Sequence, residues 1–275
     1  MRSILVLVAA AATAFGASPL AVVRPAISES DGGAPDPPNY QHPPGQTLFF
    51  TCRIANFTKS SDEKFHVAYS VQAFDPRGVP LDKIYKNEVI DEAGPQDRDW
   101  MPKVETEVVI PPLVATGDYK IVVKVEDLLA HTSAAAELPF EVRGHAFQPA
   151  DKVAVQNFRF LRHEDDLQAM DRAAYKPGDG VWTQFDITGF HYGPNNKIDV
   201  SYVASVIAPS GKVLWTQPEP AAEQSESFYP KLYIPADFGI SLQPNIHPGT
   251  YTIAIAVKDA IGNQTCESRQ DFTIE

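Results

Sequence analysis

The chain has 275 residues, of which 44% are hydrophobic and 21% charged, so it can form one large or two ordinary domains with real cores. Its formal net charge of −12 argues against nucleic acid as a partner, because phosphates require a basic surface, and against docking on anionic lipid. The 24 prolines and 16 glycines favour many turns and strand edges over helices.

Residues 1–17 have the pattern of a secretory signal peptide. Arg2 precedes an apolar run and small residues follow, so cleavage is expected after Ala14 or Ala17. The run is too short for a transmembrane helix, and no second hydrophobic span follows it. We therefore expect a protein that is secreted or located in the periplasm or cell envelope, with no integral membrane span in the mature chain.

Residues 18–43 are polar and rich in Pro and Gly, a composition typical of a spacer. Residues 21–28 within it can supply an edge strand. A disordered mature N-terminus is the alternative interpretation.

The remainder of the chain contains two copies of one unit. Pro44-Gly45 aligns with Pro177-Gly178 at an offset of 133 residues, and the strand starting at Gly117 aligns with the one starting at Gly249 at an offset of 132. In the middle, Trp100 aligns with Phe228 at an offset of 128. Offsets held through many identities indicate a duplicated domain. We place domain 1 at 44–143, a linker at 144–152 and domain 2 at 153–275.

Apolar residues recur with a period of two in both copies, which predicts strands with one buried face. Several short strands with frequent turn signals indicate an all-β antiparallel sandwich, with a closed barrel as the alternative. Between the strands, middle loops are expected at 82–99 and 216–227. Residues 164–174 are expected to form a short helix or an ordered loop.

The pattern Gly-x-Tyr-x-Ile, at Gly117 and again at Gly249, resembles the tyrosine corner of immunoglobulin-like and fibronectin-type-III-like sandwiches. The Pro-Gly turn and the two strands after it are similar to bacterial Ig-like modules. The resemblance implies two tandem Ig-like domains in which Tyr119 and Tyr251 bond back to the preceding connection. The usual disulfide is missing, because Ile121 and Ile253 stand where its second cysteine would be.

Cys52 and Cys266 are the only cysteines, one in each copy, and both are expected to point inward. Two residues in separate cores do not meet the Cα spacing of a disulfide. We therefore expect two packed free thiols, and a Cys52–Cys266 bridge is the alternative.

No metalloprotease, nucleophile-elbow, phosphate-loop or EF-hand motif occurs. The seven histidines lack metal-ligand spacing. His163 with the acids at 164–166 could hold a cation, but a solvated acidic turn is the simpler interpretation. Asp127 and Asp259 end equivalent strands, and we interpret them as turn caps rather than Ca²⁺ ligands. We expect no catalytic residue, no cofactor and no metal site.

The middle loops differ most between the copies, and loops of sandwiches often carry binding sites. Four residues at their ends either contact a partner or are buried at the start of a strand: Trp100, Met101, Phe228 and Tyr229. We expect an exported, non-enzymatic protein that binds a protein or glycan at the cell envelope or extracellularly. The alternatives are a secreted inhibitor or accessory subunit of an enzyme, and a small hydrolase using acids between the domains.

Overall fold

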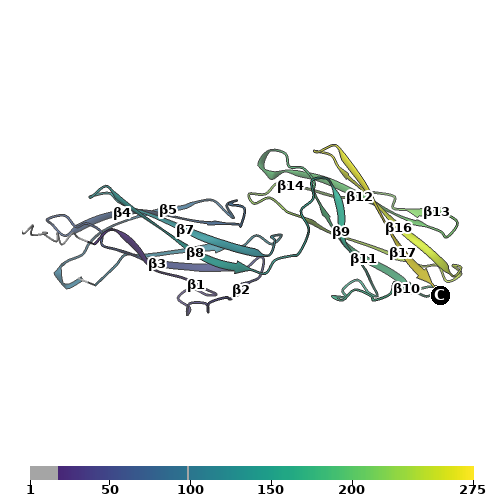
Figure 1. Cartoon of the computed structure of the whole chain (residues 1–275), viewed down its shortest axis with the longest axis horizontal. Helices are drawn as coiled ribbons and strands as arrows, with labels where there is room; N and C mark the ends of the chain where they lie inside the picture. The colour runs from purple at the N-terminus through teal and green to yellow at the C-terminus, as the bar shows by residue number, and fades with distance from the viewer. Residues whose placement is uncertain (1–17, 98) are drawn as a thin grey trace, which may run out of the picture.

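The structure is a computed structural model that describes residues 18–97 and 99–275. Within these ranges the chain forms two all-β domains joined end to end (Figure 1). The expected signal peptide, residues 1–17, lies outside the described residues.

Domain 1 is a sandwich of two sheets. One is antiparallel, in the order β1-β3-β6, and consists of β1 (Ala21–Ser28), β3 (Thr47–Ala55) and β6 (Lys103–Val109). The other has the order β2-β8-β7-β4-β5 and consists of β2 (Gln41–His42), β8 (Thr132–Val142), β7 (Gly117–Asp127), β4 (Lys64–Phe74) and β5 (Tyr85–Glu92). Only the β2–β8 pair is parallel among these strands. Two separate sheets rule out the closed barrel.

Domain 2 repeats this strand order. Its smaller sheet, β15-β11-β9, consists of β15 (Ile234–Ser241), β11 (Gly180–Thr188) and β9 (Ala154–Leu161). Its larger sheet, β10-β17-β16-β12-β13 with β14 also on β12, consists of β10 (Ala174–Tyr175), β17 (Gln264–Ile274), β16 (Gly249–Asp259), β12 (Ile198–Ile207), β13 (Val213–Thr216) and β14 (Ala221–Ser225). The predicted fold class, two tandem antiparallel Ig-like sandwiches, is confirmed by this repeated order.

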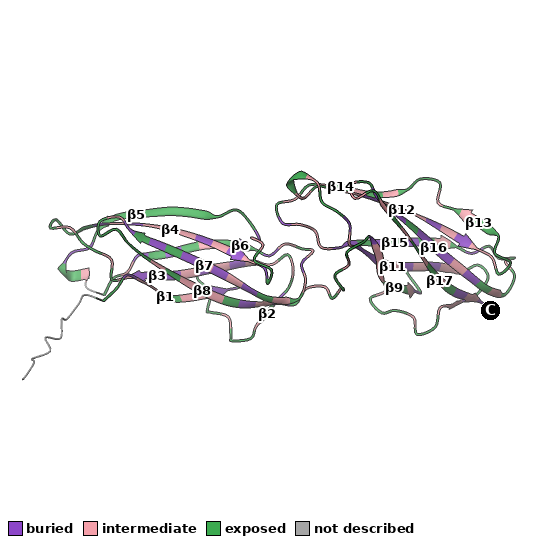
Figure 2. Ribbon diagram, turned by 45° about the horizontal axis from the view of Figure 1, so that its top comes forward, coloured by how far each residue is buried: buried purple, intermediate pink, exposed green. Residues whose placement is uncertain are grey.

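The cores follow from the alternation seen in the sequence. In β3, Leu48, Phe50 and Ile54 are fully buried, while the residues between them are only partly covered. In Figure 2, buried residues alternate with half-buried and exposed ones along strands of both domains. Burying an aliphatic or aromatic side chain of this size contributes about 1.5–3 kcal/mol, so each sandwich is stabilised mainly by these facing rows.

Both tyrosine corners are present. The hydroxyl of Tyr119 donates to the carbonyl of Ala115 at 2.8 Å, and that of Tyr251 donates to the carbonyl of His247 at 2.8 Å. Each bond connects the strand to the segment immediately before it. The predicted hydrogen bonds of the two tyrosine corners are therefore confirmed.

The edge strand expected at residues 21–28 is present, whereas the structure corrects the rest of the expected spacer at 18–43. Ala21–Ser28 forms β1 and pairs with β3, and Gln41–His42 forms β2 and pairs with β8, so both segments belong to the sandwich of domain 1. Ile27 and His42 are buried there. The Pro- and Gly-rich composition describes only the connection between these two strands.

The expected middle loops also contain strands. Residues 82–99 include β5, and residues 216–227 include β14. The sequence conceals β5 because it is an edge strand with almost no buried face, so its residues do not alternate between polar and apolar. Residues 164–174 contain no helix; they form an ordered loop that ends in β10.

Candidate functional site

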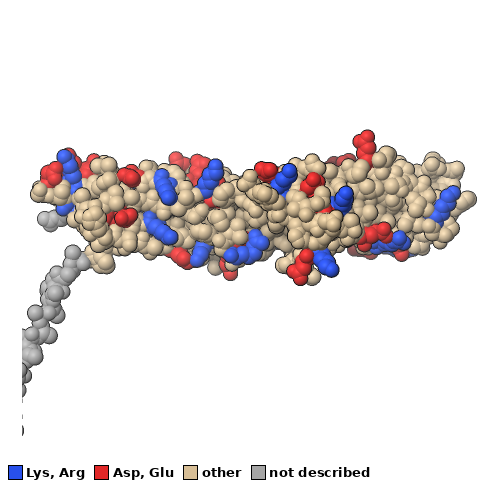
Figure 3. Space-filling view, turned by 90° about the horizontal axis from the view of Figure 1, so that it is seen from above, with Lys and Arg blue, Asp and Glu red and all other residues tan. Residues whose placement is uncertain are grey.

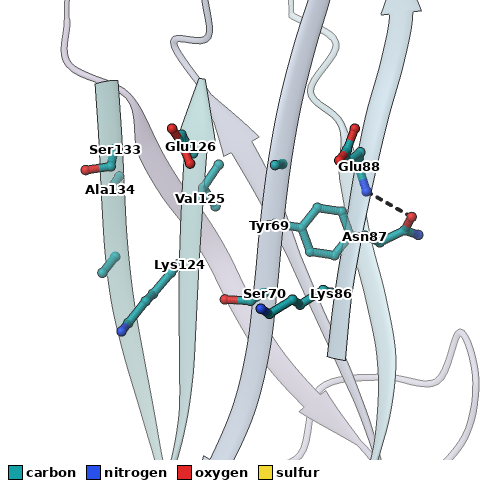
Figure 4. A pocket seen from close by; sticks show the side chains of 12 residues that line it. Tyr69, Ser70, Lys86, Asn87, Glu88, Lys124, Val125, Glu126, Ser133 and Ala134 are labelled. Carbon is teal, nitrogen blue, oxygen red and sulfur yellow. Dashed lines mark hydrogen bonds between the residues drawn. The ribbon is translucent and has the colours of Figure 1, made fainter. Parts of the chain in front are cut away.

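The outer face of the larger sheet of domain 1 is hollowed over the middle of β4, β5, β7 and β8. The hollow has a volume of about 860 Å³ (Figure 4). Its floor consists of small residues: Ala68, Ser70, Ser133 and Ala135. We call this surface the groove. It forms because small side chains occupy the outward positions at the centre of the sheet.

Four charged side chains stand around this floor in two rows. Ala68 on β4 pairs with Glu88 on β5 and with Glu126 on β7, so the two carboxylates flank it. Two residues further along β4, Ser70 pairs with Lys86 and with Lys124. We call Glu88 with Glu126 the acidic row and Lys86 with Lys124 the basic row. Two strand spacings, about 10 Å, separate the members of a row.

The rows are largely free to bind another molecule. Glu88 forms a 2.8 Å ion pair with His66. Among the described residues, Lys86, Lys124 and Glu126 form no salt bridge within 4.0 Å, and all four row members are exposed. The carboxylates of the acidic row and the ammonium groups of the basic row therefore form no ion pair with one another.

A second hollow of about 380 Å³ continues the groove along β4. The two share Ser70 and Lys124. Its apolar lining comes from Phe74, Ile84 and Val122, and Ile84 is 43% exposed. Gln72 also lines this hollow, as do Lys120 and Glu137, whose ammonium and carboxylate groups pair with each other at 2.9 and 3.1 Å. Along β4 the surface therefore changes from acidic to basic to a mixed hollow with an apolar part.

The second copy serves as an internal comparison for this surface. Its register places Ser201 opposite Lys258 and Val203 opposite Ala256, where domain 1 has Ala68 with Glu126 and Ser70 with Lys124. At the edge, Ser201 pairs with Ala222. Both copies fold the same way, so the two charged rows are not needed to form the sheet.

The sites expected from the sequence lie elsewhere. His163 and Asp166 are in an exposed loop, where the backbone N–H of His163 donates to Asp166 at 2.9 Å. Asp127 accepts from the backbone N–H groups of Leu129 and Ala130, as a turn cap. Asp259 caps the equivalent turn through Ile261 and Gly262. In the described ranges no group of three metal-ligating side chains occurs.

Both cysteines are free, and the expected packing is confirmed. Cys52 is 1% exposed in the core of domain 1, whereas Cys266 is partly buried against the core of domain 2. Burial raises the pKa of the Cys52 thiol to about 12, with a small opposing effect of Arg53. Burial also raises the pKa of Cys266.

Three of the four candidate contact residues at the ends of the middle loops, namely Trp100, Phe228 and Tyr229, differ in their exposure. Trp100 is 42% exposed at the free end of domain 1, where its ring contacts Phe57 and Phe65. Its counterpart Phe228 is 47% exposed, but the neighbouring Tyr229 is 6% exposed and packs into the core of domain 1. Tyr229 therefore contributes to the contact between the two domains.

The hydroxyl of Tyr229 hydrogen-bonds to a buried carboxylate at the end of domain 1. Its hydroxyl lies 2.9 Å from Oδ2 of Asp75, whose side chain is 1% exposed. Arg77 forms a salt bridge to the same oxygen at 2.8 Å, and the backbone N–H groups of Arg77 and Val79 donate to Oδ1. Burial, with Tyr119 and Asp75 close by, raises the pKa of Tyr229, so the phenol stays protonated and acts as the donor.

The linker forms hydrogen bonds with both domains. The backbone N–H of His145 donates to the carbonyl of Val114 in domain 1, and the His145 ring bonds Asp186 in domain 2 at 2.5 Å. A Cβ on Gly144 would lie 2.3 Å from the carbonyl oxygen of Val114, so the close approach requires glycine. These contacts connect the linker to domain 1 on one side and to domain 2 on the other.

No protein-family model matches the chain, and no curated protein matches it. Among solved structures, the chain described as "BspA_C_WT" is similar over 91% of this chain and 99% of its own, with 10% sequence identity and a TM-score of 0.29. A TM-score this low does not indicate a shared fold. The class, a two-domain Ig-like sandwich protein, therefore rests on strand order and on the two tyrosine corners.

Sequence reasoning missed the groove. Lys86 and Glu88 lie in a segment interpreted as a loop, and only the pairing of β5 with β4 brings them beside Lys124 and Glu126. The available signal was the difference between copies: Lys124 and Glu126 align with Ala256 and Lys258 on otherwise similar strands.

Proposed function

We propose that this is an exported, non-enzymatic binding protein that holds a protein or glycan partner in the groove of domain 1. The observation that carries the proposal is the pair of charged rows, which the sheet of domain 1 has and the equally well-formed sheet of domain 2 lacks. Exposed charges are common on any protein surface, so the proposal depends on their arrangement in two rows around a hollow that is found in domain 1.

Acidic and basic side chains are interspersed over the face of the molecule that Figure 3 shows. No helix among the described residues has the length and apolar character to cross a membrane. Export is supported by residues 1–17, and N-terminal sequencing of the mature protein should find cleavage after Ala14 or Ala17.

The test compares retention on the envelope fraction of the producing cells. The wild-type protein should sediment with that fraction, whereas Lys86→Ala with Lys124→Ala should lose most of the binding. The matched control is Lys258→Ala with Arg269→Ala, which removes two positive charges from the equivalent face of domain 2 and should bind normally. Equal binding by all three would contradict the proposal.

The same preparation tests the absence of catalysis. A purified chain that turned over a substrate in a hydrolase panel, with loss on a single carboxylate substitution, would refute a non-enzymatic role. If the retained partner is an enzyme whose activity changes on binding, the protein acts as an inhibitor or accessory subunit.

A further inference from the structure

The chemistry of the groove limits its ligand, and this inference rests on the proposed function. Along β4, the acidic row flanks Ala68 and the basic row flanks Ser70. The hollow that follows has an apolar part formed by Val122, Ile84 and Phe74; its charged residues Lys120 and Glu137 pair with each other. A ligand that uses the whole surface must present positive, negative and apolar groups in that order.

The distance between the acidic row and the basic row matches the side-chain period of an extended peptide. Residues two apart on a strand are about 6.6–6.8 Å apart, and side chains on one face of any extended peptide have the same period. An extended chain lying along β4 can therefore place one side chain over each row. The small floor at Ala68, Ser70 and Ala135 leaves room for its backbone.

Glycans fit the charges less well. An anionic glycan is attracted by Lys86 and Lys124 but repelled by Glu88 and Glu126 one row away. A neutral glycan offers hydroxyl groups that can hydrogen-bond to the four side chains, but no charge that pairs with them. A peptide that alternates charge satisfies both rows at once, and each exposed ion pair contributes up to about 1 kcal/mol.

We propose that the groove binds an extended peptide segment of the pattern basic–x–acidic–x–aliphatic, running along β4 in one of its two directions. The basic side chain lies over Glu88 and Glu126, the acidic one over Lys86 and Lys124, and the aliphatic one in the hollow of Phe74, Ile84 and Val122.

Four capped heptapeptides test this on the whole chain by fluorescence anisotropy. Thr-Lys-Thr-Glu-Thr-Val-Thr and its reverse represent the two directions, and Thr-Glu-Thr-Lys-Thr-Val-Thr and its reverse are their counterparts with the charges exchanged. One of the first two should bind, and more weakly at higher ionic strength. Its exchanged counterpart should bind at least about fivefold more weakly, the effect of losing two exposed ion pairs.

A charge-exchange variant provides the sharpest result. Lys86→Glu and Lys124→Glu combined with Glu88→Lys and Glu126→Lys keeps the net charge and should prefer the exchanged peptide. Lys258→Ala with Arg269→Ala should leave every affinity unchanged. Thermal unfolding of each variant checks that it folds, which is expected because all the changed side chains are exposed.

The possible failures are distinguishable. If no peptide binds, or the exchange variant does not reverse the preference, while envelope binding still requires Lys86 and Lys124, the peptide class is overturned and the proposed function stands. Groove-dependent binding of a glycan on an array, or self-association through the groove, also overturns it. If nothing binds through the groove, the proposed function fails as well.

Discussion

The hydroxyl of Tyr229 in domain 2 donates a 2.9 Å hydrogen bond to the buried carboxylate of Asp75 in domain 1. A donor from one domain thus completes the hydrogen bonding of a charge buried in the other. Replacing Tyr229 by Phe should cost about 1–3 kcal/mol at the domain contact, because the bond to a charged acceptor is lost. The measurable result is a broader distribution of interdomain angles in residual dipolar couplings.

Phe228→Leu is the control for this change, because Phe228 is adjacent but half exposed. It should leave the dipolar couplings unchanged. Identical couplings in wild type and Tyr229→Phe would show that the hydrogen bond does not hold the domains.

The tyrosine corner of domain 2 predicts a local loss of stability. Tyr251→Phe removes a 2.8 Å hydrogen bond to the carbonyl of His247 and should destabilise domain 2 by about 1 kcal/mol. Chemical denaturation in a Trp100→Phe background, in which the tryptophan fluorescence comes only from Trp182 and Trp215 of domain 2, measures this change. An unaltered midpoint would contradict a stabilising corner.

Asp127 predicts a pH dependence for domain 1. Burial acts to raise the pKa of Asp127, but hydrogen bonds from the backbone N–H groups of Thr58, Ala130 and Leu129 outweigh it and lower the pKa. A carboxyl with a lowered pKa in the folded state stabilises it above the unfolded pKa of about 3.9. This stabilisation is lost as the pH falls through the folded pKa.

Urea midpoints between about pH 5 and pH 2 should therefore fall less steeply for Asp127→Asn than for wild type. The Asn variant should also be less stable at pH 7, because it exchanges a charged acceptor for a neutral one. Parallel pH curves for the two proteins would contradict the assignment.

The burial of the two cysteines predicts that their thiols react poorly with alkylating reagents in the folded protein. With its pKa raised to about 12, buried Cys52 should not react with iodoacetamide at pH 8 until the protein unfolds. Cys266, only partly buried, should react slowly. Mass spectrometry of the native and denatured protein distinguishes the two, and a mobility difference between reducing and non-reducing gels would reveal an unexpected bridge.

The buried strands were predictable from the sequence because they have a physical period. Leu48, Phe50 and Ile54 alternate with polar residues since one face of β3 packs on the opposite sheet. The duplication and the corner at Tyr119 were readable for the same reason, since repeated burial repeats the pattern. The turn caps at Asp127 and Asp259 followed from their equivalent positions.

The edge strand and the groove were not predictable in this way. β5 has nearly every residue exposed, so Lys86 and Glu88 carry no periodic signal. Their relation to Lys124 and Glu126 depends on a register across three strands, which is a tertiary property. The burial of Tyr229 likewise depends on the other domain, and no local pattern around residue 229 contains that information.

The contact between the domains also limits how many such units can join. Its two halves are divided between the copies: Asp75 and Arg77 align with Ala208 and Ser210, and Tyr229 aligns with Met101. The free end of each copy therefore lacks the group that its neighbour would need. A head-to-tail contact between identical units can continue into a filament, whereas this contact has its two halves only at the junction of copy 1 with copy 2. The differences between the copies thus make the junction specific for one order of the two domains.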